Sequence, residues 1–280
     1  MNAIETQGLR YVYEDGTVAL ESLDFAAKRG CVTGVLGANG AGKSTLFLCL
    51  NGVLAPMGGT VRLSGQAVAF DRKGVKSLRK KVGIVFQDPD DQLFSSDVYR
   101  DISFGAVNLG LPEDEVRRRV EDAMEQVGIS HLRDKPVHAL SYGQKKRAAI
   151  AGVLVMRPEI LILDEPTAGL DPQAAANMVC LCRTLQHTYG MTILLATHDI
   201  DLVPLLCDDV YLLSEGSIAA HGAPDELLRD PALFRAHHLR LPRIAHLMEI
   251  LREKDGFPVD PGAATIGKAR REIKRLMEDG

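Results

Sequence analysis

The stretch Gly37-Ala38-Asn39-Gly40-Ala41-Gly42-Lys43-Ser44 decides the fold of this 280-residue chain. It matches the pattern G-x-x-x-x-G-K-[ST], in which backbone N–H groups close around phosphates and the lysine neutralises the outer phosphates. The motif follows a short apolar run, residues 31–36, and opens a segment with helical spacing, residues 43–50. The N-terminus of a helix favours an anion. This order of strand, loop and helix predicts a nucleotide-binding site with Ser44 as a Mg²⁺ ligand.

A pair of acidic residues follows the apolar run at residues 160–163. We expect this run to be a buried strand that carries Asp164 and Glu165 to its end, next to the phosphate loop in a parallel sheet. Asp164 is then placed to hold Mg²⁺ through water, and Glu165 to orient the water that attacks the γ-phosphate. The alternative is two exposed acids at a strand end, which the upstream phosphate loop disfavours.

The stretch Leu140-Ser141-Tyr142-Gly143-Gln144 begins a helix. The serine hydroxyl and the free N–H groups of the first turn form a second anion site, although the serine alone could be a simple N-cap. The phosphate loop and this second anion site are difficult to place on one γ-phosphate within one chain. They are compatible if two chains face each other head to tail and share each nucleotide, which predicts a dimer.

Short apolar strands alternate with helical segments through most of the chain, which predicts an α/β fold with a mainly parallel sheet covered on both faces. Residues 4–27 instead indicate antiparallel strands joined by a turn at residues 14–17. Helical periodicity over residues 97–127, interrupted at residues 110–112, predicts an inserted helical subdomain. An amphipathic run, a Gly/Pro-rich break and a charged helix after residue 238 predict a C-terminal appendage.

Composition restricts the possible partners. The net charge of −4 offers no basic excess for nucleic acid. The N-terminus lacks the apolar core of a signal peptide. The longest uncharged apolar stretch, residues 148–156, is shorter than the ~20 residues that span a bilayer. Five cysteines, without zinc-site spacing, are interpreted as reduced, buried thiols of a cytosolic protein. Any membrane role is therefore expected to be peripheral, at the cytoplasmic face.

Five separate motifs resemble those of ABC ATPases, in the order and spacing of that family. They are the phosphate loop at 37–44, Leu140-Ser-Tyr-Gly-Gln144, Leu163-Asp-Glu-Pro166, Ala168-Gly-Leu-Asp171 and Thr197-His-Asp199. The resemblance covers residues 3–238. It implies a RecA-like core, an antiparallel β subdomain and a helical subdomain at about 88–158, together forming an ATP-binding domain at 1–238. Residues 239–280 are then a helical dimerisation appendage.

The resemblance also assigns roles to individual residues. Gln87 matches the glutamine that senses Mg²⁺ and γ-phosphate, and His198 the switch histidine. Asp171 matches an aspartate at the dimer interface, and Tyr13 an aromatic residue that stacks on adenine. The expected catalytic residues are Glu165, His198 and Gln87. The expected Mg²⁺ ligands are Ser44, Gln87 and Asp164. The expected ATP contacts are Tyr13, Gly37, Asn39, Gly40, Ala41, Gly42, Lys43, Ser44, Thr45, Ser141, Gly143, Gln144 and Asp171.

Two stretches, residues 87–94 and Leu241-Pro242-Arg243, resemble the ATPases of energy-coupling-factor importers, especially the cobalt/nickel subgroup. The partners implied are a transmembrane coupling protein, a small substrate-capturing membrane protein and a second ATPase chain, identical or related. The cargo implied is cobalt, with nickel or a vitamin as alternatives. A soluble ABC ATPase acting on nucleic acid or ribosomes typically has a long coiled-coil insertion or two cassettes, and this chain has neither. A module that binds ATP without hydrolysing it is disfavoured by Glu165 and His198.

Two features depart from the simplest interpretation. Tyr142 stands where the family has glycine, and it either adds a contact across the dimer or slows turnover. The histidines at 221, 237, 238 and 246 suggest a metal site, but adjacent residues of a helix point to different faces. We therefore do not expect these histidines to bind a metal ion together.

Overall fold

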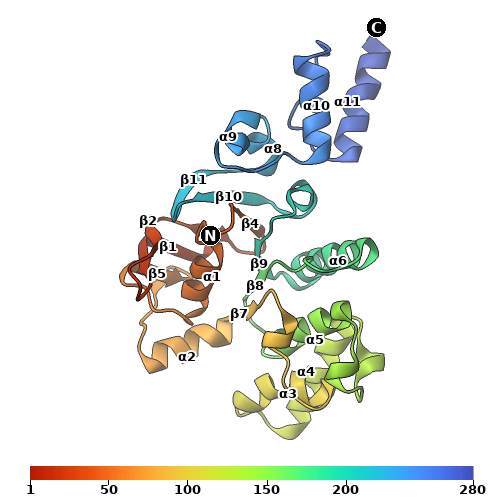
Figure 1. Cartoon of the computed structure of the whole chain (residues 1–280). Coiled ribbons are helices and arrows are strands. Elements are labelled where there is room, and N and C mark those ends of the chain that lie inside the picture. Colours follow the sequence, from red (N-terminus) through yellow and green to blue (C-terminus); the bar gives the residue numbers. More distant parts are fainter. Residues whose placement is uncertain (280) are drawn as a thin grey trace.

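A six-stranded sheet lies at the centre of the computed structural model, which describes residues 1–279 (Figure 1). Its strand order is β11-β10-β4-β9-β8-β7. The strands are β4 (Val32–Leu36), β7 (Val82–Val85), β8 (Ile160–Asp164), β9 (Thr192–Ala196), β10 (Asp209–Ser214) and β11 (Ser217–Gly222). Neighbouring strands are parallel, apart from the antiparallel pair of β10 and β11. The predicted parallel α/β core is confirmed.

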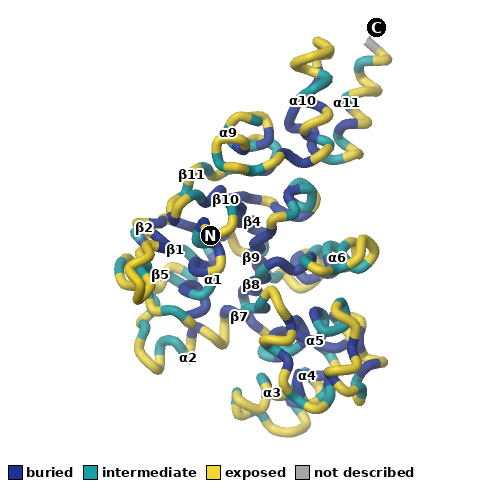
Figure 2. Tube along the Cα trace, viewed as in Figure 1, coloured by how far each residue is buried: buried dark blue, intermediate teal, exposed yellow. Residues whose placement is uncertain are grey.

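The central strands are buried on both faces because their alternate side chains enter two different cores. Leu161 and Leu163 of β8 pack in one hydrophobic cluster, on the side of the helical region. Ile160 and Ile162 pack in another cluster, on the side of the antiparallel strands. Figure 2 shows these strands as continuously buried segments. Burying one such side chain contributes roughly 1.5–3 kcal/mol.

The N-terminal strands form the predicted antiparallel subdomain. Its strands are β1 (Asn2–Val12), β2 (Val18–Leu23), β3 (Ala26–Lys28), β5 (Gly58–Leu63) and β6 (Gln66–Ala67). Strand β1 pairs with β2, β3 and β5, and each pairing is antiparallel. Ile4, Leu9 and Phe25 from this subdomain are fully or almost fully buried in the same cluster as Phe47 of α1 (Lys43–Asn51). This shared core joins the subdomain to the phosphate loop.

The inserted helices lie below the sheet in Figure 1. They are α3 (Val98–Asn108), α4 (Glu113–Gln126) and α5 (Tyr142–Leu154), which contact one another. Gly110, with φ +76°, supplies the left-handed residue after α3, and Pro112 is the N-cap of α4. The break predicted at residues 110–112 is therefore confirmed. The short 3-10 turns η1 (Pro89–Asp91), η2 (Ser130–Leu132) and η3 (Val137–Ala139) connect this region.

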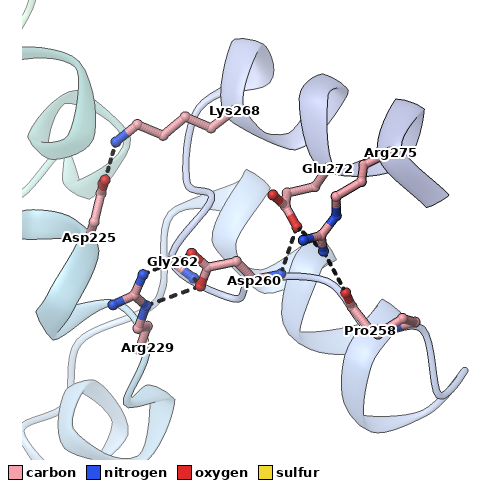
Figure 3. A network of polar contacts seen from close by, with 8 residues as sticks. All are labelled: Asp225, Arg229, Pro258, Asp260, Gly262, Lys268, Glu272 and Arg275. Carbon is pink, nitrogen blue, oxygen red and sulfur yellow. Dashed lines mark hydrogen bonds and ion pairs between the residues drawn. The ribbon is translucent and has the colours of Figure 1, made fainter. Parts of the chain in front are cut away.

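The chain ends in a helical appendage beyond α8 (Pro224–Leu227) and α9 (Pro231–Ala236). Helices α10 (Arg243–Glu253) and α11 (Ile266–Asp279) enclose a small core around Met248, which is 0% exposed. Figure 3 shows how polar contacts attach them to the domain. Arg229 binds Asp260 through two hydrogen bonds of 3.1 and 2.9 Å, and Lys268 pairs with Asp225 of α8.

Helix α2 (Arg72–Lys81) and the exposure of the cysteines differ from the sequence expectations. Helix α2 was not anticipated, because basic residues dominate it and Leu78 is its buried residue. Between β9 and β10 the chain forms η4 (Ile200–Leu202) and α7 (Val203–Leu206), and α6 (Pro172–Tyr189) is one continuous helix before β9. The five cysteines are free thiols, but Cys180 on α6 is exposed and Cys31 is only partly buried, so the expectation of buried thiols is wrong for these two. Across residues 1–279, no helix combines the length and apolarity needed to cross a bilayer.

We expect Met248→Ala to loosen the appendage selectively. Truncating a fully buried methionine costs about 2–5 kcal/mol, and Met248 belongs to a small core separate from the two large ones. Hydrogen exchange followed by mass spectrometry should show faster exchange in α10 and α11. The matched control is Met57→Ala, because Met57 is 68% exposed in the loop before β5. Unchanged exchange in the Met248 variant would contradict this account of the appendage.

Candidate active site

The phosphate loop leaves the C-terminal end of β4 and enters α1. Gly42 caps this helix with φ +102°, and a Cβ there would lie 2.5 Å from the Ala19 carbonyl oxygen. Lys43 is buried, and its Nζ donates hydrogen bonds to the carbonyl oxygens of Gly37, at 2.8 Å, and Ala38, at 3.0 Å. Burial lowers the pKa of the Lys43 ammonium, whereas Glu165 and Asp164 raise it. The loop thus encloses a positive charge next to two carboxylates.

The two acidic residues approach the loop from β8, with β9 between β8 and β4. Ala196 of β9 pairs with Val35 of β4 on one side and with Asp164 on the other, so the three strands end at the same level. The Ser44 hydroxyl donates a hydrogen bond of 2.8 Å to Asp164 Oδ2. Burial raises the pKa of the Asp164 carboxyl, and the bond from Ser44 lowers it. The predicted Mg²⁺ ligands Ser44 and Asp164 are in direct contact.

Glu165 is buried and has a left-handed backbone, with φ +50°. Its Oε2 atom lies 2.8 Å from Nδ1 of His198, which lies two positions after the end of β9. This short contact is not a hydrogen bond, and among residues 1–279 the buried Oε2 has no hydrogen-bond partner. An unpartnered buried acceptor is costly and calls for an explanation. The carboxylate is available for a water or a substrate group.

A cleft of 350 Å³ opens over the loop. Its lining residues are Tyr13, Thr17, Val18, Ala19, Asn39, Gly40, Ala41, Gly42, Lys43, Ser44, Thr45, Gln87, Asp164 and Glu165. The Tyr13 hydroxyl lies 2.9 Å from Thr45 Oγ1, and the Tyr13 ring is packed edge-on to Tyr11. The cleft therefore combines one aromatic wall with the phosphate loop and the carboxylates, and Gln87 lies at its border.

The remaining predicted contacts lie outside this cleft. Ser141 caps α5, where its Oγ accepts from the Gln144 N–H at 3.4 Å and Gln144 Oε1 accepts from the Ser141 N–H at 3.0 Å. Asp171 caps α6 by accepting from the Ala174 N–H at 2.8 Å. Ser141 and Asp171 are exposed, and Gly143 is half-buried. Within one chain, these residues are not brought to the phosphate loop.

Lys146 is a site residue that the sequence analysis missed. It is 3% exposed, and its Nζ donates a hydrogen bond of 2.7 Å to the Glu165 carbonyl oxygen. Burial lowers the pKa of its ammonium to about 8, although Glu165, Asp88 and Asp164 act in the opposite direction. A signal was present, because Lys146 lies four residues before Ile150 and seven before Val153, on the buried face of α5.

Two of the four histidines considered as metal ligands pair with carboxylates in the structure. His221 Nε2 lies 2.9 Å from Asp209 Oδ2, and His246 Nδ1 lies 3.0 Å from Glu249 Oε2. Over residues 1–279, no three His, Cys, Asp or Glu side chains come together as a metal-binding group.

Comparison with known proteins identifies the family. Residues 20–168 match the family model described as ABC transporter. This chain belongs to that family. The energy-coupling factor transporter ATP-binding protein EcfA3 of Clostridium perfringens is 54% identical over 270 residues, covering 96% of this chain and 95% of that protein. EcfA of Methanocaldococcus jannaschii is 48% identical over 279 residues, covering 100% and 99%.

A solved structure agrees with this assignment. It is described as cbiO1 from Clostridium perfringens, part of the ABC transporter complex cbiONQ, and is 53% identical with a TM-score of 0.78. The match covers 89% of this chain and 99% of that chain. This protein is accordingly an ABC ATPase of the energy-coupling-factor group, which binds ATP and hydrolyses it to energise transport. The predicted family, fold and enzyme class are confirmed.

The pKa of Lys146 predicts a pH effect on stability. A lysine whose folded pKa is near 8 and whose unfolded pKa is near 10.5 binds fewer protons when folded, between these values. Its contribution to the free energy of unfolding therefore rises with pH across this window. Lys146→Met removes this titration. Urea unfolding at pH 7.5 and 10 should show the free energy of the wild type rising relative to that of the variant, and parallel changes would contradict the prediction.

Proposed function

We propose that this ATPase works as a head-to-tail dimer on the cytoplasmic face of the cell membrane, where it drives import of cobalt ions through membrane partners. The observation that carries the proposal is the cleft in which Lys43, Ser44, Asp164 and Glu165 converge, while the second anion-binding element, at Ser141, faces outward. One chain thus supplies two complementary halves of a nucleotide site. Two chains are needed to bring them together.

In this proposal Lys43 and the loop residues hold the phosphates. Glu165 orients the attacking water, His198 contacts the γ-phosphate, and Gln87 senses the metal and γ-phosphate. Tyr13 stacks on the adenine after releasing its hydroxyl contact with Thr45. The partner chain's copies of Ser141, Gly143 and Gln144 complete the site, with Asp171 at the interface. The loop residues involved are Gly37, Asn39, Gly40, Ala41, Gly42, Ser44 and Thr45.

A magnesium ion fits the donors in the cleft. The Ser44 hydroxyl and the Asp164 carboxylate lie 2.8 Å apart, and Gln87 borders the same space. Hydroxyl, carboxylate and amide oxygens are the hard ligands that Mg²⁺ prefers. When bound, the ion would neutralise charge on the nucleotide phosphates. We propose Ser44, Gln87 and Asp164 as its protein ligands, with Asp164 acting through water.

The membrane coupling protein has a suitable groove next to the nucleotide site. A cavity of 680 Å³ lies between α2, α3 and α5, with Phe86 and Gln92 in its wall. Phe94 and Phe104 at this groove are 65% and 50% exposed, with ring centroids 4.9 Å apart. Large exposed aromatic side chains mark interaction sites. Phe86 precedes Gln87 in the chain, so movement of a docked cytoplasmic helix would be transmitted to the site.

The proposals for the cargo and for the remaining partners are based on similarity to known proteins. The proposal of cobalt is supported by the subgroup resemblance of residues 87–94 and of Leu241-Pro242-Arg243, and by the likeness to cbiO1. A small membrane protein would capture the cargo. We further propose that residues 1–238 form the ATP-binding domain, with a helical subdomain at about 88–158, and that residues 239–280 assist dimerisation. Exposed Ile266 and Met277 of α11 support this last role.

We expect Glu165→Gln to reduce the ATP hydrolysis rate by at least ~100-fold while ATP binding is retained, because the water loses its positioned base. The matched control is Glu159→Gln, since Glu159 precedes the opposite end of β8 and pairs with Arg29 and Lys81. Phosphate release and equilibrium ATP binding would be measured for both variants. Wild-type hydrolysis by the Glu165 variant would refute the role assigned to Glu165.

Removing the phosphate-binding charge should act on a different step. Lys43→Ala should weaken ATP binding itself, because the loop loses the ammonium that faces the phosphates. Isothermal titration with ATP and Mg²⁺ measures this change. Unaltered affinity would show that Lys43 is not the phosphate ligand.

A pull-down from detergent-solubilised native membranes tests the transporter. We expect two small multi-helix proteins to co-purify, with cobalt found by elemental analysis. Phe94→Ser with Phe104→Ser should reduce this co-purification, whereas Tyr189→Ser, at an exposed aromatic residue outside the groove, should not. Recovery of nickel would change the proposed cargo from cobalt to nickel. Recovery of membrane partners without either metal would indicate a vitamin as the cargo. Recovery of nucleic acid or ribosomes without membrane proteins would contradict the proposed function.

A further inference from the structure

Lys146 connects α5 to the end of β8 through a buried contact. Its Nζ donates a hydrogen bond of 2.7 Å to the carbonyl oxygen of Glu165, and the side chain is almost completely buried. A hydrogen bond from a charged donor is stronger than one between neutral groups. A buried ammonium is otherwise unfavourable, and methionine would fill the same space on this apolar helix face without that penalty. The charge therefore calls for a role beyond packing.

The group that Lys146 holds is a strained peptide. Glu165 has φ +50°, which is unfavourable for a residue with a side chain. Its N–H donates to the Ala196 carbonyl oxygen at 3.0 Å, and its carbonyl oxygen also accepts from the Ala168 N–H at 3.1 Å. The backbone of Glu165 is thus fixed from β9 on one side and from α5 on the other. These contacts determine where its buried carboxylate points.

Tyr142 covers Lys146 from one helical turn earlier. The Nζ of Lys146 lies 5.5 Å from the centroid of the Tyr142 ring, a distance suited to a cation–π contact. The same ring packs against Gly169, where a Cβ would lie 2.8 Å from a ring carbon. The Tyr142 hydroxyl is 3.5 Å from the Gln87 carbonyl oxygen, a weak contact. The tyrosine in the place of glycine therefore packs within its own chain, over Lys146.

We propose that Lys146 is a positioning residue for Glu165 and that the Tyr142 ring holds Lys146 in place. This inference rests on the proposed role of Glu165. Tyr142 and Lys146 belong to the first turns of α5, and the start of that helix is proposed to face the nucleotide of the partner chain. When the dimer closes on the partner's nucleotide, α5 shifts. The buried ammonium of Lys146 then transmits this shift to Glu165 of the same chain, whose carboxylate orients the attacking water.

The test is steady-state ATP hydrolysis by the full-length chain with Lys146→Met. We expect kcat to fall by ~10- to 100-fold, the loss associated with one charged hydrogen bond, while KM for ATP changes less than about twofold. Lys146→Arg, which retains a charged donor, should recover at least part of the loss in kcat. The matched control is Lys145→Met, because Lys145 precedes Lys146 but pairs with Asp90, at 2.6 Å. That variant should retain wild-type kcat.

Tyr142 is tested in the same assay. Tyr142→Ala should lower kcat in the wild-type background but add little to Lys146→Met, because both changes remove the same connection. Tyr142→Phe should remain close to wild type, since the hydroxyl contact is weak and the ring is retained. Full additivity of Tyr142→Ala and Lys146→Met would contradict the proposed connection.

Two outcomes separate this inference from the proposed function. If Glu165→Gln is inactive and Lys146→Met has wild-type kcat, the positioning role is refuted and the role of Glu165 stands. If Glu165→Gln hydrolyses ATP at the wild-type rate, the role of Glu165 within the proposed function fails, and this inference fails with it. Thermal unfolding and ATP titration check that the variants are folded. A Lys146→Met protein that is folded and binds ATP, with KM increased and kcat unchanged, would also overturn the inference.

Discussion

The common level at which β4, β9 and β8 end is the constraint on which the rest of the site depends. Val35, Ala196 and Asp164 are aligned across these three parallel strands by backbone pairing. The chain then continues from β4 into the phosphate loop, from β9 into the segment that carries His198, and from β8 to Glu165. Because parallel strands all point their carboxyl ends to one edge, segments far apart in sequence meet there. Two hydrophobic cores, one on each face, hold that edge rigid.

Charge balance is the second property of the site. Asp164 and Glu165 lie next to two buried lysines, Lys43 from the phosphate loop and Lys146 from α5. Buried charges are tolerated only when they are paired or hydrogen-bonded, so each lysine donates to main-chain carbonyl oxygens. Two features of Glu165 are unfavourable for stability: within residues 1–279 its buried Oε2 has no hydrogen-bond partner, and its backbone is left-handed. Such local costs occur at functional sites, where the surrounding structure maintains them.

The chain presents three candidate interaction surfaces on different elements. The nucleotide cleft lies at the edge of the sheet, the groove with exposed aromatic residues lies between α2, α3 and α5, and the appendage extends from the opposite end in Figure 1. Helix α5 borders the groove through Ala149 and Gly152, and it also carries Lys146. One helix therefore lines the groove and also holds the backbone of Glu165 through Lys146. This arrangement gives a physical route by which a membrane partner and hydrolysis would influence each other.

The sequence by itself determined the phosphate loop, the acidic pair after β8, the capped start of α5 and the alternation of strands and helices. These are local patterns, because each motif is contiguous and each strand or helix has its own period. Only the tertiary structure decided that β9 separates β8 from β4, that α2 forms a wall of the groove, and that Tyr142 packs over Lys146. Strand order, groove walls and the partner of a buried ammonium join residues distant in the chain. Burial and contact, rather than any local period, specify them.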